Sequence, residues 1–405
     1  MDIRSTTDDD LDVFVNTLHT AFGKFPETPV ADGGRWWSAL EMERGLLALG
    51  ADGRPVGTAA AYSFDLTLPG GALTPVAGVT GVGVVPSHRR RGVLSALMRR
   101  QLADVRARGE FLSVLLASEA RIYGRFGYGP ATFTAPVTVS RHRAEFAAPR
   151  ARAATDDTGS VEVLPRSDCE ELLEEVYDRY RRAQPGALSR PHRWWDLGAG
   201  QPPVARTPRY VAVHRDADGV ADGYAAYSIG GDPTTLTVDE TVTTDDAAFT
   251  ALARFALGHD LVSQVVFRHV PPDHPLRWQL ADLRAGEVGG PHDWLWVRLL
   301  DIPRAMAARG WTTDGELVLD VRDPFLAEHT RYCLTVRDGE AICVPTAERP
   351  DLSLHVGDLG SLYLGGVTPT TLVRAGHVEA HHAEAAGRAD ALFRTERAPH
   401  CLHWF

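Results

Sequence analysis

The sequence predicts an α/β protein in which two similar domains follow one another and a third domain, of α+β type, comes last. The first observation is a strand, a basic loop, a helix and a second strand in succession between Ala77 and Ala117. The second is that the same order of elements returns between Val161 and Gly290. The third is a change after Trp294 to short alternating strands and a glycine-rich string. A chain of 405 residues is long enough for this organisation.

The first domain begins with a predicted helix behind a Thr7 or Asp8 cap. Its apolar residues recur every three or four positions, which is the spacing of one packed helix face. This stripe consists of Leu11, Phe14, Val15, Leu18 and Phe22. Strands are expected at Leu46–Leu49, Gly57–Leu68 and Ala77–Val85.

A basic loop, Arg89-Arg90-Arg91-Gly92, follows the third of these strands and opens a helix that carries apolar residues from Val93 to Val105. Free backbone N–H groups at a helix N-terminus and guanidinium groups both favour an anion, and a glycine lets the backbone approach it closely. The loop therefore predicts a site for the pyrophosphate of a nucleotide cofactor. The alternative is a solvated basic turn without a ligand.

An apolar run, Phe111–Ala117, and a short helix through Tyr123 complete this unit. A stretch rich in alanine, arginine and proline, from Ala147 to Ser160, then predicts a domain boundary.

The second domain repeats the order of elements but differs at the loop that opens its last helix. Thr244-Asp245-Asp246 stands where the first domain has its arginines. Two carboxylates at a helix N-terminus satisfy the helix dipole and repel a pyrophosphate, so we expect no cofactor here. The expected helices are Glu170–Arg182 and Ala247–Leu257, and the expected strands are Tyr210–His214, Gly223–Ile229, Thr235–Thr243 and Gln264–His269.

The third domain is predicted to contain mainly strands, with one helix near its end. The expected strands are Leu295–Leu300, Leu317–Val321, Tyr332–Val336 and Ala341–Val344, followed by the Leu359–Gly366 string and a helix at Ala386–Thr395.

Two residue patterns in this domain are to be weighed as a metal site and as a cysteine pair. His377 and His381 are spaced as two ligands on one helix face, but no third ligand is evident and we expect no metal. Cys333 and Cys343 flank an Asp338-Gly339 turn, where they would be cross-strand neighbours or, as we expect for a cytosolic protein, reduced thiols.

Several strings resemble one known family. The Arg89-x-x-Gly92 loop is similar to the acetyl-CoA loop of GNAT acyltransferases, with Leu94 in place of a small residue. The string from Ser118 to Pro130 resembles the Eis family of actinobacterial acetyltransferases, in which a leucine at this place is usual. The likeness continues in Pro185-Gly186, Leu188-x-Arg190-Pro191 with Trp194 or Trp195, Leu359–Gly365 and the final Phe405. On these strings the chain is identified as a member of the Eis family.

The resemblance implies the domain organisation. It gives a GNAT domain with an acetyl-CoA site over residues 1–145 and a degenerate GNAT-like domain over residues 146–292. Residues 293–405 are implied to form a sterol-carrier-like domain whose terminus enters the active site, and we expect this domain to be a scaffold without a lipid.

The resemblance also implies the activity, an N-acetyltransferase that moves the acetyl group of acetyl-CoA to amines. Aminoglycosides are the typical acceptors of the family. Acetylation of protein lysines or polyamines is the alternative, and a non-enzymatic lipid-carrier or interaction protein is a further one. The residues implied to bind acetyl-CoA are Val82, Gly83, Val84, Arg89, Arg90, Arg91, Gly92, Val93, Leu94, Ser95, Ser118 and Glu119.

Two catalytic residues are implied. Tyr123 matches the general acid of the family, and a tyrosine with its ordinary pKa near ~10 is protonated at neutral pH and can donate to a thiolate. Tyr128 is the less favoured candidate. The main-chain carboxylate of Phe405 matches the family's base, with Glu119 and His403 as the alternatives. Trp404 departs from the family, whose best-known members have an acidic residue before the terminal phenylalanine.

The composition limits the partners. A net charge of −11 disfavours nucleic acid and favours a small cationic amine as substrate. No signal peptide or long apolar run is evident, so we expect a cytoplasmic protein that does not bind a membrane. The resemblance implies self-association, as a homohexamer.

Overall fold

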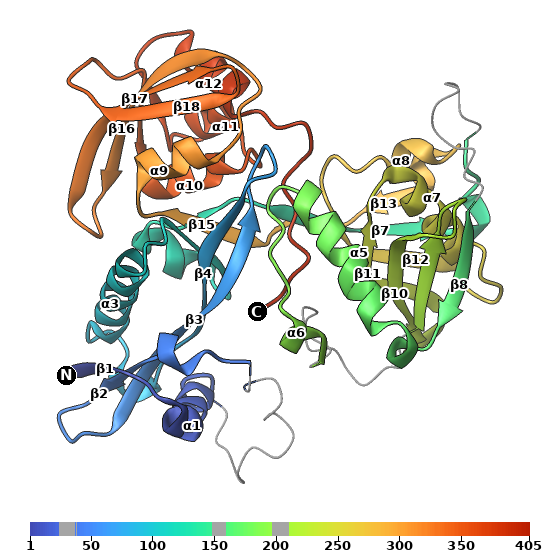
Figure 1. Ribbon diagram of the computed structural model, residues 1–405, viewed down its shortest axis with the longest axis horizontal. Coiled ribbons are helices and arrows are strands. Elements are labelled where there is room, and N and C mark those ends of the chain that lie inside the picture. Colours follow the sequence, from blue (N-terminus) through green and yellow to red (C-terminus); the bar gives the residue numbers. More distant parts are fainter. Residues whose placement is uncertain (24–36, 38, 148–158, 197–209) are drawn as a thin grey trace. The chain divides into compact units, whose positions relative to one another are not determined.

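The computed structural model describes residues 1–23, 37, 39–147, 159–196 and 210–405. The chain separates into two compact units (Figure 1). The first unit contains Met1–Ala131, Trp294–Glu396 and Phe405, and the second contains Thr132–Asp293 and Arg397–Trp404. Most of the predicted Ala147–Ser160 linker lies outside the described residues.

A seven-stranded sheet forms the centre of the first unit, in the order β1-β2-β3-β4-β5-β15-β6. Neighbours are antiparallel except β4 and β5, which run parallel. The strands predicted from the sequence are present, and the structure extends several of them. Their bounds are β1 Asp2–Ser5, β2 Leu46–Leu49, β3 Pro55–Thr67, β4 Leu73–Val84, β5 Leu112–Leu116, β6 Gly129–Pro130 and β15 Leu295–Leu299.

In the part of the chain described, the helices between β1 and β6 are α1 (Leu11–Ala21), α3 (Val93–Ala107) and the short α4 (Ala120–Tyr123). The predicted apolar stripes are buried on α1 and α3 except at Leu11 and Leu94, which are half-buried, and at Phe22. Phe22 lies beyond the end of α1 and is 60% exposed, because the chain leaves the helix at Ala21 before Phe22 reaches the packed face. The buried faces comprise Phe14, Val15 and Leu18 on α1, and Val93, Leu97, Met98, Leu102 and Val105 on α3.

A five-stranded sheet, ordered β18-β17-β16-β19-β20, forms the remainder of the first unit (Figure 1). The helix predicted at Ala386–Thr395 is present, and the glycine-rich string is part of a further helix. The bounds are α9 Ile302–Ala308, β16 Gly315–Asp323, β17 Glu328–Arg337, β18 Glu340–Pro345, β19 Leu352–His355, α10 Val356–Tyr363, α11 Pro369–Arg374, β20 Glu379–Ala380 and α12 Ala385–Phe393.

The histidine and cysteine patterns of this part form neither a pair of ligands nor a disulfide. His377 bonds to Asp358 and His381 to Ser353, so the two imidazoles have different partners. Cys333 lies opposite Val344 and Cys343 opposite Leu334, one position out of register, and both thiols are free. Among the described residues there is no group of three potential ligands that could hold a metal ion.

The second unit is built on the sheet β13-β7-β12-β11-β10-β9-β8, with β14 pairing to β7. Its predicted helices and strands are present, with ends shifted by a few residues. Their bounds are β7 Phe133–Ser140, β8 Ser160–Leu164, α5 Glu170–Ala183, α6 His192–Asp196, β9 Tyr210–Arg215, β10 Ala221–Gly230, β11 Asp232–Thr243, α7 Asp246–Leu257, β12 Gln264–Val270, α8 Leu276–Gln279, β13 Gly286–Val288 and β14 His292–Asp293.

Sheet membership does not follow the order of the sequence. β7, which precedes residue 145, pairs with β12 and β13 in the sheet of the second unit. β15, which follows residue 292, lies between β5 and β6 in the sheet of the first unit. The periodicity of a short strand does not say which sheet will accept it, so the sequence did not indicate this arrangement.

No helix in the described part of the chain is long and apolar enough to cross a membrane.

Candidate active site

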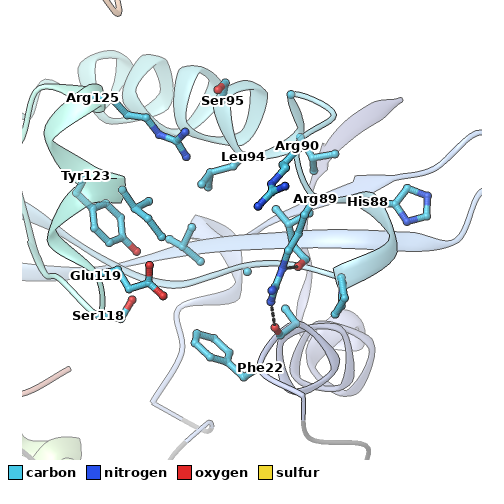
Figure 2. A pocket seen from close by; sticks show the side chains of 18 of the residues that line it. Phe22, His88, Arg89, Arg90, Leu94, Ser95, Ser118, Glu119, Tyr123 and Arg125 are labelled. Atoms are coloured by element: carbon cyan, nitrogen blue, oxygen red, sulfur yellow. Dashed lines mark hydrogen bonds between the residues drawn. The ribbon is translucent and has the colours of Figure 1, made fainter.

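A cavity of about 810 Å³ lies in the first unit, between the end of β4, the start of α3, and α4 (Figure 2). This size is within the range of sites that take a cofactor. It brings together eleven of the twelve residues implied to bind acetyl-CoA, together with Tyr123. The lining consists of Ala21, Phe22, Gly23, Val82, Gly83, Val84, Pro86, His88, Arg89, Arg90, Gly92, Val93, Leu94, Ser95, Ser118, Glu119, Ile122, Tyr123 and Arg125.

A β-bulge in β4 opens this part of the sheet. Thr58 of β3 pairs with Gly83 and Ala60 pairs with Thr80, so two residues of β4 oppose the single Ala59 between them. Gly81, at the bulge, has a φ of +58°, which favours glycine. Pairing between β4 and β5 runs from Ala77 to Val79, before the bulge. Val82, in the bulge, and Gly83 and Val84, after it, line the cavity, where their backbone groups can meet a ligand.

The N-terminus of α3 lies at the cavity and is suited to an anion. Gly92 is its N-cap with a φ of +82°, and a β-carbon built there would meet no atom of the described residues within 4 Å. With no side chain at the cap, the first N–H groups of α3 are not capped by Gly92, and a helix N-terminus favours negative charge. Arg90 also has a positive φ, +61°, and such strain in a residue other than glycine is concentrated at functional sites.

The three arginines of the loop differ in what they do. Arg89 donates from Nη2 to the carbonyl oxygen of Ala21 at 2.6 Å and from Nε to that of Val84 at 3.3 Å. It therefore ties the loop to the end of α1 and to β4. Arg90 lines the cavity (Figure 2). Arg91, the twelfth implied residue, is exposed and is not among the described residues that line the cavity.

Tyr123 and Tyr128 occupy different surroundings. Tyr123 lines the cavity, with Ser118 and Glu119 beside its hydroxyl (Figure 2). Burial raises the pKa of Tyr123 above its ordinary value, although the nearby Ser118 side chain acts in the opposite direction. The hydroxyl thus stays protonated at neutral pH. Tyr128 is fully buried, lies 2.7 Å from the Oγ atom of Ser113 and does not line the cavity in the part of the chain described.

Phe405 is buried in the first unit and is not among the described residues that line the cavity. Its ring packs against Phe64 with the ring centroids 5.1 Å apart, and against Tyr62 at 6.4 Å. Gly78 makes room for these rings, since a β-carbon there would lie 2.5 Å from Phe64 and 3.2 Å from Phe405. Only 8% of Phe405 is exposed. The apolar seat expected for this ring is therefore present.

Sequence reasoning missed several lining residues, above all Phe22, His88 and Arg125. Arg125 lies two residues after Tyr123, and its guanidinium points into the space above Leu94 (Figure 2). Its proximity to Tyr123 in the sequence could have indicated that it lines the cavity. No sequence signal indicated Phe22 or His88, because their positions at the cavity depend on where α1 and the turn at Pro86–His88 end.

The corresponding helix of the second unit has the expected cap. Asp245, the N-cap of α7, accepts a hydrogen bond from the backbone N–H of Ala248 at 2.9 Å. A carboxylate thus occupies the position where α3 has only Gly92.

Comparison with known proteins agrees with this geometry. An acetyltransferase (GNAT) domain model matches residues 2–131, a second one matches residues 186–299, and a sterol carrier protein domain model matches residues 302–402. The N-acetyltransferase Eis of Mycobacterium tuberculosis is 32% identical over 97% of this chain and 96% of its own. The chain belongs to the Eis family of N-acetyltransferases.

Further relatives cover the full length of the chain. An uncharacterized N-acetyltransferase of Streptomyces griseus is 36% identical over 99% of both chains. The crystal structure of Eis1 from Mycobacterium abscessus superposes with a TM-score of 0.86 and 34% identity, covering 100% of both chains. This Eis-family protein thus has two GNAT domains followed by a sterol-carrier-like domain, and the predicted fold class is confirmed.

GNAT domains imply the use of acetyl-CoA, and the residues of the first unit fit it. The open volume beside Gly92, the N-terminus of α3 and the Arg90 side chain suit the pyrophosphate. The opening of β4 after the bulge suits an extended arm that hydrogen-bonds to the backbone. When bound, acetyl-CoA supplies the activated acetyl group.

Proposed function

We propose that this Eis-family protein transfers the acetyl group of acetyl-CoA to an amine of a cationic small molecule, and that aminoglycosides are its acceptors. The observation that carries the proposal is the single cavity that holds both the N-terminus of α3 with Arg90 and the Tyr123 hydroxyl. An anion-binding helix end and a proton donor in one cavity serve a reaction in which a bound thioester loses a thiolate.

In this proposal Arg90 and the first turn of α3 hold the pyrophosphate, and Val82–Val84 bind the arm that leads to the thioester. Tyr123 donates its proton to the sulfur as the C–S bond breaks. A thiol with an ordinary pKa near ~8.5 leaves more readily when it receives a proton as it departs.

The amine must lose a proton as its nitrogen forms the new C–N bond. We propose that the carboxylate of Phe405 orients the ammonium group and accepts this proton through water. Burial of the Phe405 ring beside Phe64 supports the role, because a fixed ring restricts the carboxylate attached to the same residue.

Membership of the Eis family and the charge of the chain support aminoglycosides as acceptors. The net charge of −11 attracts polycations, and Glu119 places a carboxylate at the cavity. Trp404 distinguishes this chain from members with an acidic residue at that place. A homohexamer remains a prediction for this chain, and light scattering during gel filtration measures it directly.

The test is release of free CoA, followed with a thiol reagent, across an aminoglycoside panel, spermidine and a lysine peptide. We expect kcat/KM for at least one aminoglycoside to exceed the values for spermidine and the peptide tenfold or more. An Arg90→Ala, Gly92→Asp double variant controls for acetyl transfer outside the cavity. A higher kcat/KM for spermidine or the peptide would overturn the aminoglycoside assignment, and no release with any amine would overturn the acetyltransferase assignment.

A further inference from the structure

Tyr123 begins a closed turn in the first unit, at the end of α4. Its carbonyl oxygen accepts from the backbone N–H of Tyr128 at 3.3 Å, and the carbonyl oxygen of Gly124 accepts from the N–H of Gly127 at 3.0 Å. Gly127 has a φ of +82°, in the left-handed region. The two bonds and the left-handed glycine make Tyr123–Tyr128 a Schellman motif, in which the chain turns back at the end of a helix. The backbone of Tyr123 is therefore tied to the position of Gly127.

Arg298 of β15 lies directly against this glycine. A β-carbon built on Gly127 would lie 2.5 Å from Nη1 and 2.9 Å from Nε of Arg298, so the guanidinium fills the space that a side chain would need. The Arg298 side chain is fully buried and forms an ion pair with Asp323, the last residue of β16. The ion pair thus holds the guanidinium against the Schellman motif.

Stability alone does not account for this arginine. Its Nε and Nη1 atoms are buried without a hydrogen-bond partner among the described residues. A buried donor that lacks a partner costs about 1–3 kcal/mol, and apolar residues of similar volume often replace a buried ion pair without loss. What the planar guanidinium does provide is a rigid surface for the backbone of Gly127.

Asp323 also shapes the turn that follows β16. Its Oδ1 atom accepts from the backbone N–H of Leu326 at 3.2 Å. The turn carries Phe325, whose ring packs edge-on against Phe126 with the ring centroids 4.9 Å apart. The Arg99 guanidinium lies 4.6 Å from the centroid of the same Phe325 ring, a distance typical of a cation–π contact. Phe325 thus contacts both α3 and the Schellman motif.

The start of α10 packs on the end of the motif. A β-carbon on Gly357 would lie 3.0 Å from the carbonyl oxygen of Tyr128, and one on Gly360 would lie 2.3 Å from that of Val297. These two glycines let α10 approach the motif and β15 closely. β16, the turn after it and α10 all belong to the sterol-carrier-like domain. Three separate contacts from this domain or through Arg298 therefore converge on the segment that carries Tyr123.

We propose that Arg298, fixed by Asp323, is a positioning residue for acetyl transfer. It holds Gly127, and through the Schellman motif it keeps the Tyr123 hydroxyl where the thiolate leaves. A misplacement of about 1 Å can cost on the order of 10²-fold in rate. The sterol-carrier-like domain thus takes part in the reaction by supplying Asp323, although none of its described residues lines the cavity. The inference rests on the proposed role of Tyr123 as the general acid.

The test compares Arg298→Met in two backgrounds of the full-length protein. Single-turnover release of CoA, with enzyme in excess over acetyl-CoA and the amine of the panel with the highest kcat/KM, measures acetyl transfer itself. With Tyr123 present we expect Arg298→Met to lower this rate at least tenfold and to change the acetyl-CoA Kd less than twofold. In the Tyr123→Phe background the same substitution should change the rate less than twofold, because the hydroxyl that Arg298 positions is already absent.

A second variant keeps the test valid if Arg298→Met folds poorly, since that substitution leaves the Asp323 carboxylate buried without its cation. Arg298→Met combined with Asp323→Asn leaves no buried charge and keeps an acceptor for the N–H of Leu326. We expect this double variant to recover most of the melting temperature but to remain at least tenfold slow in acetyl transfer. Recovery of the rate as well would mean that the ion pair acts through stability alone.

A second readout measures the Schellman motif without catalysis. Arg125 is exposed in this motif, and trypsin cleaves after it once the motif opens locally. Below the melting temperature of each variant, we expect cleavage after Arg125, identified by mass spectrometry, to be at least fivefold faster in both Arg298 variants. Arg309→Met is the matched control, because Arg309 is buried in the same unit and donates to the carbonyl oxygens of Tyr363 at 2.9 Å and Phe393 at 3.2 Å. It should lower the melting temperature without faster cleavage or slower acetyl transfer.

Tyr123→Phe separates this inference from the function on which it rests. A slow Tyr123→Phe variant beside fully active Arg298 variants would overturn the role of Arg298 alone. A Tyr123→Phe variant as active as the unmodified chain would overturn the role of Tyr123 and this inference with it. Equal rate losses from Arg298→Met in the two backgrounds, or unchanged cleavage after Arg125, would also overturn the inference.

Discussion

Two tyrosines five positions apart differ in almost every property that matters for proton transfer. Tyr123 lines the cavity, whereas Tyr128 is fully buried beside Ser113. Their rings touch edge to face, with the centroids 6.2 Å apart. Of the two, only Tyr123 is among the described residues that line the cavity, as the proposed general acid must be.

Tyr123→Phe should lower kcat by roughly 10²–10⁴-fold, the usual loss for a general acid, with the acetyl-CoA Kd nearly unchanged. The hydroxyl is needed when the thiolate leaves and not when the cofactor docks. Tyr128→Phe loses one buried hydrogen bond and should lower stability by about 1 kcal/mol with little effect on kcat. Steady-state kinetics and calorimetry measure both variants, and equal losses of kcat would show that the acid is misplaced.

Substitutions of Arg89 and of Arg90 should also have different effects on acetyl-CoA binding and on stability. Arg90→Ala removes a charged donor from the cavity and should raise the acetyl-CoA Kd about 10- to 100-fold, with the melting temperature unchanged. Arg89→Ala removes the bonds to Ala21 and Val84, so the melting temperature should fall and the Kd should rise less.

Arg100→Ala is the control for this pair. Arg100 lies on the same helix, exposed and paired with Asp104, and such surface pairs contribute little to stability. The expected order of Kd values is Arg90→Ala above Arg89→Ala above Arg100→Ala, and the reverse order of the first two would contradict the assignment.

At the scale of elements, the helices α3 and α7 differ in their N-cap residues. Gly92 leaves the first turn of α3 open to a ligand, and Asp245 closes that of α7 with its own carboxylate. The same position in two similar domains thus carries opposite charge.

Calorimetry with acetyl-CoA should therefore give one site per chain. The Arg90→Ala, Gly92→Asp double variant should abolish binding, because it removes a cation and adds a carboxylate and backbone strain at one site. A stoichiometry of two, or binding that persists in the double variant, would show that the second unit also holds the cofactor.

Much of this could be predicted from the sequence, because local signals were strong. The helix stripes, the basic loop before Gly92 and the Asp245 cap each follow from a few neighbouring residues. The exchange of β7 and β15 between sheets could not, since a strand of five residues such as β15 carries no mark of its partners. Arg89 was placed at the pyrophosphate, but its bonds to Ala21 and Val84 depend on where distant elements end.

At the scale of the whole molecule, the second unit should be sensitive to acid. Burial lowers the pKa of His269 to about 4, that of His274 to about 4 and that of His400 to about 3. The three lie close enough that His269 and His274 each lower the pKa of His400 further. For His269, the charges of His292 and Arg268 lower the pKa further, and that of Glu240 raises it. For His274, Arg397 lowers the pKa further, and Asp246 and Asp273 raise it.

The direction of the pH dependence of stability follows from the number of protons that the folded and unfolded states bind. Between about pH 6.5 and about pH 4 the unfolded histidines are protonated while the folded ones are neutral, so stability falls as the pH falls through this window. Each of His269 and His274 should account for on the order of 3 kcal/mol across it. Thermal unfolding between pH 7.5 and pH 4.5 should show this loss.

His274→Asn identifies the contribution of one group. The backbone N–H of Leu276 donates to Nδ1 of His274 at 3.2 Å, and asparagine offers an oxygen near that position. The variant should flatten the dependence of melting temperature on pH. An unchanged slope would mean that His274 does not titrate between the folded and unfolded states as described.

The exchange of β15 into the first sheet has a consequence for synthesis on the ribosome. β5, which leads into Ser118 and Glu119, keeps one edge open until β15 is made. That strand follows about 180 residues later, which is roughly 9–36 s at 5–20 residues per second. During this interval the nascent chain carries the apolar strand Leu112–Leu116 at an unprotected edge, a site that chaperones bind and that aggregates recruit. The seven-stranded sheet, whose first strand is translated first, is thus completed only after residues Thr132–Asp293 of the second unit have been translated.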